Sequence, residues 1–144
     1  DFTNQINATK DAGGIDNNHY SDSVATVKSL KKEGRNQEAI ELLLKCVEAT
    51  ENEAHFANSQ PPLLDSKYSY LFDEESDKSW GVAPWYYEQL AIIYRKEKQY
   101  QNEVEILERY AKQKKAKGMK PQKLAERLIK AKELMEKKRM ANQL

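Results

Sequence analysis

The stretch that decides the fold is Tyr87-Glu88-Gln89-Leu90-Ala91-Ile92-Ile93-Tyr94, which is echoed by Pro121-Gln122-Lys123-Leu124-Ala125-Glu126-Arg127-Leu128. Both stretches carry Leu-Ala with a large residue, Tyr94 or Leu128, three positions after the Ala. The two stretches begin 34 residues apart. A fixed period of about 34 residues is typical of stacked helix-turn-helix units. The sequence therefore predicts an all-α fold made of antiparallel helical hairpins, the kind of scaffold that binds a partner and performs no catalysis.

The spacing of apolar residues predicts five main helices. They are expected over about 22–33, 36–54, 84–97, 101–116 and 121–140. Gly34 suits the turn after the first of them, because glycine tolerates the left-handed conformation that ends helices. Pro84 and Pro121 suit first helical turns, where the missing N–H costs nothing.

A chain of 144 residues is expected to form one domain. The helical domain is predicted over 21–140. Residues 1–20 are polar and rich in Asn, which predicts a flexible arm without a core. Residues 55–82 break the helical pattern with Pro61-Pro62 and an acidic tract over 73–77, and we interpret them as an insertion. One hypothesis is that this acidic tract covers a basic binding surface.

Composition indicates the secondary structure and the cellular compartment of the chain. Charged residues make up 33%, with 5 Gly and 4 Pro, which favours helix over sheet. The single cysteine, Cys46, cannot form an internal disulfide, so a reducing, cytoplasmic location is expected. No apolar run reaches the roughly 18 residues of a membrane span. The chain does not begin with Met, and one hypothesis about its function is that it is a piece of a larger enzyme.

Charge is distributed unevenly along the chain. Residues 109–144 carry 13 Lys/Arg and 3 Asp/Glu, whereas residues 1–78 carry 8 and 15. This asymmetry indicates an acidic partner for the C-terminal end, although a solvated helical face is the simpler interpretation.

No constellation of catalytic side chains is evident. His19 lies in the polar arm and His55 at a helix end, and each is interpreted as a surface histidine. A zinc site needs about four convergent ligands, which one Cys and two scattered His do not supply. No Gly-rich phosphate loop is present. We therefore predict no catalytic residue, no metal ligand and no cofactor, and expect that the chain is not an enzyme.

Tyr87, Leu90, Ala91, Tyr94 and Tyr100 occupy the places of an aromatic, Leu, a small residue, Tyr and an aromatic in a known motif. On these residues the chain resembles the tetratricopeptide repeat (TPR) family, with about two and a half repeats over 21–54 and 84–140 and the insertion between the first and second. Glu103 and Tyr110 depart from the pattern, because small residues are usual at those places. The resemblance implies a short right-handed superhelix.

In that family the first helix of each pair lines the concave wall, so the resemblance implies which residues meet a partner. They are Lys28, Lys31, Lys32, Trp85, Gln89, Ile92, Arg95, Lys96, Lys123 and Lys130. A basic wall with an aromatic residue suits an acidic peptide, a carboxylate or a phosphate chain. Two alternatives stay open: the lysines are ordinary solvent-facing residues, and Trp85 is either an exposed hot spot or a core residue.

The alternative function is nucleic-acid association through the basic C-terminal helices, 109–139. Nine cations would then contact phosphates. They are Lys112, Lys114, Lys115, Lys117, Lys120, Lys123, Arg127, Lys130 and Lys132. Affinity carried by phosphate contacts would fall steeply with salt. The sequence predicts no membrane partner and no particular oligomeric state.

Overall fold

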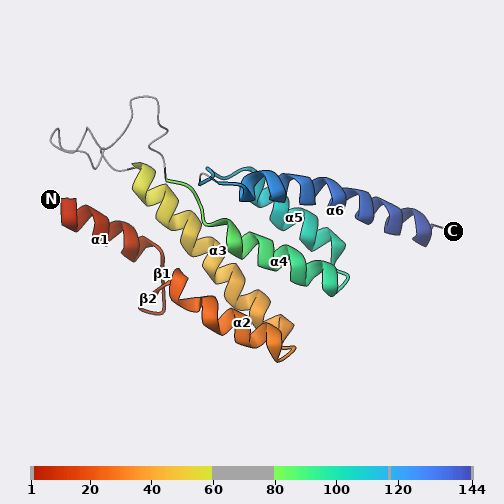
Figure 1. The fold of residues 1–144 in the computed structure, drawn as a ribbon, viewed down its shortest axis with the longest axis horizontal. Helices are drawn as coiled ribbons and strands as arrows, with labels where there is room; N and C mark the ends of the chain where they lie inside the picture. The colour runs from red at the N-terminus through yellow and green to blue at the C-terminus, as the bar shows by residue number, and fades with distance from the viewer. Residues whose placement is uncertain (1, 60–79, 117, 144) are drawn as a thin grey trace.

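A computed structural model describes residues 2–59, 80–116 and 118–143, in which six α-helices and one two-stranded hairpin are present (Figure 1). The elements are α1 (Phe2–Ala12), β1 (Gly14–Ile15), β2 (Asn18–His19), the 3-10 helix η1 (Tyr20–Ser23), α2 (Val24–Lys32), α3 (Asn36–Ser59), α4 (Pro84–Lys96), α5 (Tyr100–Ala111) and α6 (Lys120–Asn142). The predicted all-α class is confirmed, with one helix more than the five expected.

Two short turns fold the chain back on itself. Between α2 and α3, Gly34 has a φ of 74° and the Arg35 N–H donates to the Leu30 carbonyl at 2.9 Å. Between α4 and α5, Lys98 has a φ of 59° and the Gln99 N–H donates to the Tyr94 carbonyl. A left-handed residue with a bond five residues back is the usual way for a helix to end. Both turns lie where the sequence predicts them.

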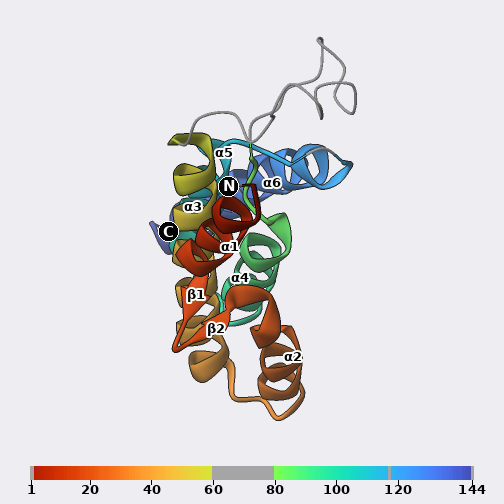
Figure 2. The ribbon, with the colours of Figure 1, turned by 90° about the vertical axis from the view of Figure 1, so that its left-hand side faces the viewer.

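The helices pack in chain order, α2 on α3, α3 on α4, α4 on α5 and α5 on α6, and α4 also contacts α6. Figure 2 shows α2, α4 and the first turns of α6 along one side of the molecule, with α3 along the other. Every second helix of this series therefore contributes to the same side.

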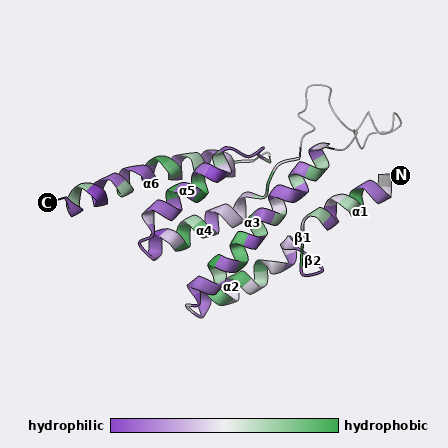
Figure 3. Cartoon of the chain, turned by 180° about the vertical axis from the view of Figure 1, so that it is seen from behind, coloured by the Kyte–Doolittle hydropathy of each residue, from purple (hydrophilic) through white to green (hydrophobic). Residues whose placement is uncertain are grey.

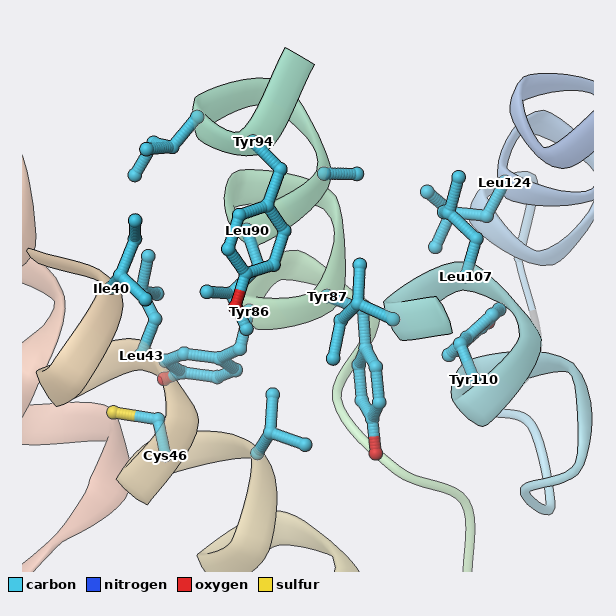
Figure 4. Close-up of a cluster of buried hydrophobic side chains, with 14 of the residues drawn as sticks. Ile40, Leu43, Cys46, Tyr86, Tyr87, Leu90, Tyr94, Leu107, Tyr110 and Leu124 are labelled. Atoms are coloured by element: carbon cyan, nitrogen blue, oxygen red, sulfur yellow. The ribbon is translucent and has the colours of Figure 1, made fainter. Parts of the chain in front are cut away.

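The core is continuous across the helices from α3 to α6. Leu43, Leu90, Leu107 and Leu124 are buried in one apolar cluster, to which each of these helices contributes (Figure 4). Hiding a leucine side chain from water stabilises a fold by about 2 kcal/mol. Figure 3 shows that hydrophilic residues dominate α6, with apolar residues interspersed, and its buried residues are Leu124 and Ala131. Leu90 and Leu124 thus both lie in the shared interior, as the 34-residue repeat requires.

The prediction of a core-free arm over residues 1–20 is wrong. Residues 2–12 form α1, which packs on α3, and Thr9 and Tyr20 are buried. The Thr9 hydroxyl donates to the Gln5 carbonyl at 2.9 Å, which lets this polar residue enter the interior. Contacts with a distant helix override the weak local propensity of this polar segment.

Two helix ends also differ from prediction. α3 continues to Ser59, so the insertion does not begin at residue 55, and residues 60–79, with the acidic tract 73–77, lie outside the described part. α5 ends at Ala111 and not at 116. Residues 114–116 instead meet residues 81–82, where the Val82 N–H donates to the Lys114 carbonyl at 2.9 Å. We call this backbone contact the clasp.

Candidate functional site

Two adjacent residues on α4 connect it to both flanking helices. The Lys31 ammonium on α2 donates to Gln89 Oε1, and the Lys120 ammonium on α6 donates to Glu88 Oε1 at 2.8 Å. Because Glu88 and Gln89 are neighbours on the outer side of α4, α2 and α6 flank that same side. We call the outward sides of α2, α4 and the first half of α6 the basic face.

Trp85 and Ile92 form the apolar part of this face. Each lies about one turn from Glu88 and Gln89 on α4, and both are half-buried. The Trp85 ring meets the Tyr86 ring edge-on at 5.2 Å between centroids, and Trp85 packs against the core cluster. Trp85 is therefore neither a free aromatic nor a fully buried one, since one side is held by the core and the other remains accessible.

Five of the predicted cations extend into solvent from the basic face. They are Lys28, Lys32, Lys96, Lys123 and Lys130, and within the described residues none has a carboxylate within 4.0 Å. The pKa of Lys31 is lowered, first by burial and then by the nearby charge of Lys96, with Glu88 opposing both. Lys31 and Lys96 are therefore close enough for their charges to interact, with Glu88 beside them.

Arg95, another predicted partner-binding residue, differs from these five in that it is held in an ion pair. Its Nη2 lies 2.9 Å from Glu103 Oε2, and Arg127 Nη2 lies 3.3 Å from the same oxygen. Burial, followed by the charge of Arg95, lowers the pKa of Arg127, while Glu103 raises it. Arg95 is held toward the interior because the buried carboxylate of Glu103 needs a counter-charge.

A second feature is a cavity of about 250 Å³ at the opposite end of α3 from its first turn. It is lined by Ile6, Thr9, Lys10, His19, Tyr20, Glu53 and Trp80. α1 and the end of the β-hairpin supply most of these residues, and α3 supplies Glu53. The cavity therefore depends on the docking of a segment that the sequence alone does not predict to be ordered.

Glu53 is the centre of the polar contacts in the cavity. Its side chain accepts from His19 Nε2 at 2.5 Å, from the Tyr20 hydroxyl at 3.0 Å and from Trp80 Nε1 at 3.3 Å. Burial is the main cause that raises the pKa of Tyr20 to about 12. The three donors hold the carboxylate in place, with only 3% of Glu53 exposed.

His19 is held by contacts at both ring nitrogens. The Ser21 backbone N–H donates to His19 Nδ1 at 3.3 Å. Nε2 lies 2.5 Å from Glu53 Oε2, at ion-pair distance. The Ser21 hydroxyl also reaches Nδ1, at 2.8 Å, and the three side chains form a connected chain.

The connected side chains of Ser21, His19 and Glu53 resemble a proton relay in composition. However, the Ser21 backbone N–H, which acyl transfer would need, makes another contact. The Ser21 N–H is directed at the His19 ring, so it is not available to stabilise an oxyanion beside its own hydroxyl. The arrangement is better suited to holding Glu53 than to activating Ser21. Sequence reasoning treats His19 as a surface residue, because nothing in its spacing from Glu53, 34 residues away, indicates the pairing.

The described residues contain no group of three or more His, Cys, Asp and Glu side chains placed to hold a metal ion. None of the helices in 2–59, 80–116 and 118–143 combines the length and apolar character of a membrane span. Comparison of the chain with protein-family models, with curated proteins and with solved structures gave no match.

Proposed function

We propose that the protein is a non-catalytic interaction module with a TPR-like superhelical stack, and that its basic face binds an acidic segment of a partner protein. The observation that carries the proposal is the pair of contacts from α4, Gln89 with Lys31 and Glu88 with Lys120. These contacts align the first helices of three successive units, which is the arrangement by which such stacks present a binding wall.

The chemistry of the face favours an acidic ligand with some apolar character. Lys28 and Lys96 supply positive charge on α2 and α4, and Lys123 adds charge on α6. Charge complementarity speeds encounter and excludes basic partners. On α4, the half-buried Trp85 and Ile92 offer apolar area, which supplies affinity that screened surface charges do not.

Nucleic acid is the less favoured partner because three of the nine cations named for it, Lys120, Arg127 and Lys132, are already in ion pairs. Lys120 lies 2.8 Å from Glu88, and Lys132 lies 3.4 Å from Glu108. Arg127 and Arg139 likewise pair with Glu103 and Glu136. Binding to a phosphate backbone depends on cations that are free to replace counterions. The basic excess of the C-terminal segment is therefore partly neutralised within the fold.

The proposal is tested by fluorescence anisotropy with a labelled peptide of Asp, Glu and Leu. The variant Lys28→Glu/Lys96→Glu reverses two charges of the basic face. The matched control, Lys45→Glu/Lys112→Glu, makes the same change in net charge at exposed lysines outside the face. We expect affinity to fall about tenfold or more in the first variant, roughly 1.4 kcal/mol, and about twofold in the control.

Two outcomes contradict the proposal. Equal loss in the two variants would show that only net charge matters. Tighter binding to single-stranded or duplex DNA than to the peptide, with steep salt dependence, would favour the nucleic-acid alternative.

A further inference from the structure

We infer that Arg127 on α6, together with Arg95 on α4, binds a side-chain carboxylate of the acidic partner segment. The inference deepens the proposed function and rests on it, because it assigns the part of the basic face that holds an Asp or Glu of the partner. It stands on the charge balance around Glu103, on the hydrogen bonds of the arginines and on the position of Arg127 on α6.

Two guanidinium groups share one buried carboxylate. Arg95 Nη2 lies 2.9 Å and Arg127 Nη2 lies 3.3 Å from Glu103 Oε2. Both arginines remain protonated, so these two cations exceed their anion by one charge. Among the described residues, the other carboxylate whose charge acts on Arg127 is that of Glu88, which already has the Lys120 ammonium at 2.8 Å. The cluster therefore retains one positive charge, which suits one further carboxylate and is too little for a row of phosphates.

Arg127 is held less firmly than the other arginines of the chain. Each of the others donates from Nε to a carboxylate oxygen: Arg35 to Glu38, Arg95 to Glu103, Arg109 to Glu51 and Arg139 to Glu136. Arg127 Nε is buried and has no hydrogen-bond partner within the described part of the chain, and Arg95 Nη2 is likewise buried without one. Charged donors that lack an acceptor are costly. Both guanidinium groups therefore have hydrogen-bonding capacity that Glu103 does not use.

Arg127 lies where the outer sides of α4 and α6 meet. Lys123 and Lys130, both exposed, are four residues before it and three residues after it, so they share its side of α6. The exposed fraction of the side chain is 25% for Arg127 and 33% for Arg95. Because both guanidinium groups approach the same Glu103 oxygen, one carboxylate from the partner can bridge them without entering the core.

The environment of Arg127 favours a second carboxylate. Its pKa is lowered first by burial and then by the charge of Arg95. A bridging carboxylate would oppose this repulsion, and its two oxygens match the planar fork of a guanidinium group. An ion pair that is partly shielded from water is also stronger than one at an exposed lysine such as Lys28. This place on the basic face should therefore contribute more to recognition than the lysines around it.

The test follows the arginine Nε–H resonances of the isotopically labelled full chain by NMR. The probe is a peptide of Asp, Glu and Leu with both ends blocked, so that its carboxylates are those of side chains. We expect the Arg127 resonance to shift saturably, with the dissociation constant that anisotropy gives. Arg35 and Arg139, which are exposed and bonded to their own carboxylates, should not move. A matched peptide of Asn, Gln and Leu should leave Arg127 unchanged.

Variants measure how much the guanidinium group contributes. Arg127→Gln should lower peptide affinity about tenfold, and Arg127→Lys, which keeps the charge without the planar fork, should restore only part of it. Arg139→Gln makes the same charge change at an exposed residue near the end of the helix, and it should lower affinity about twofold or less. The NMR titration needs no variant, so it decides the question if Arg127→Gln does not fold.

Two kinds of failure are distinguishable. Peptide binding that leaves the Arg127 resonance in place, or equal losses in Arg127→Gln and Arg139→Gln, would overturn this inference and not the proposed function. Absence of peptide binding by the unaltered protein would overturn both.

Discussion

The carboxylate of Glu103 on α5 lies 2.9 Å from the guanidinium of Arg95 on α4, and none of the Glu103 side chain is exposed. Arg127 on α6 approaches the same carboxylate at 3.3 Å, so three helices meet at one ion cluster. Glu103 stands where the resemblance to the TPR family leads us to expect a small residue. The two arginines explain how a charged residue occupies that interior position.

Replacement of Glu103 by Gln should destabilise the fold strongly. Two guanidinium groups would lose their shared counter-charge, and removal of one partner from a buried ion pair costs about 3–5 kcal/mol. The free energy of unfolding is measured in urea. Glu105→Gln, an exposed change on the same helix, should cost less than about 0.5 kcal/mol. Similar losses in both variants would mean that the buried cluster contributes nothing specific.

Substitution of Gly81 by Ala should break the clasp. An added Cβ would lie 2.1 Å from the Ala116 backbone nitrogen, and backbone cannot move aside as a side chain can. We expect a loss of about 3 kcal/mol and faster hydrogen exchange at the Val82 amide. Gly34→Ala is the comparison, because no atom lies within 4 Å and only the positive φ of 74° opposes it, at about 1–2 kcal/mol. A smaller effect at Gly81 than at Gly34 would contradict the close approach.

Alkaline solution should unfold the protein through its buried tyrosines. Burial is the leading cause that raises the pKa of Tyr20 to about 12, and the pKa values of Tyr86 and Tyr87 are also raised chiefly by burial. An unfolded tyrosine has a pKa of about 10, so above that pH the unfolded state loses protons that the native state retains. The stabilisation is complete below pH 10 and is lost as pH rises through about 12.

The measurement combines absorbance of ionised tyrosine with circular dichroism across this range. Ionisation of Tyr20 should coincide with loss of helical signal. Phenylalanine at Tyr20 provides the control, because it removes one ionising group and should reduce the slope of stability against pH. Complete tyrosine ionisation near pH 10 in a fully helical protein would contradict the prediction.

Cys46 should resist thiol reagents in the native state. It is fully buried, and burial is the main cause that raises the pKa of its thiol, while a hydrogen bond with Ser23 lowers it. Because the thiolate is the reactive form, labelling by a chromogenic disulfide should be at least about 100-fold slower than in urea. Labelling at the same rate in both conditions would show that α2 separates readily from α3.

The helices that sequence predicts best are those whose local signals agree with their packing. Pro84 begins α4 as expected, and Gly34 ends the first hairpin turn. α1 is missed because it has few apolar residues, and its order derives from contact with α3, which local periodicity does not report. The end of α5 is misplaced for a related reason, since residues 114–116 pair with residues distant in sequence.

The residues of the predicted site also fall into those that local periodicity places and those that tertiary contacts place. Gln89 and Trp85 lie on one side of α4 because helical periodicity places them there, and this much is readable from sequence, whereas the contact of Lys31 with Gln89 comes from the packing of the helices. The ion pair of Arg95 depends on Glu103, a charged residue that a pattern of apolar positions assigns to solvent. The pairing of His19 with Glu53 depends on the docking of α1, so it required the structure.

The clasp has a consequence for how the fold bears a mechanical load. Val82 is bonded to the backbone of Lys114, so the start of α4 has its own anchorage. A force applied to the chain before residue 80 would therefore act first on this backbone pairing, which shields α4 and the helices after it from that load.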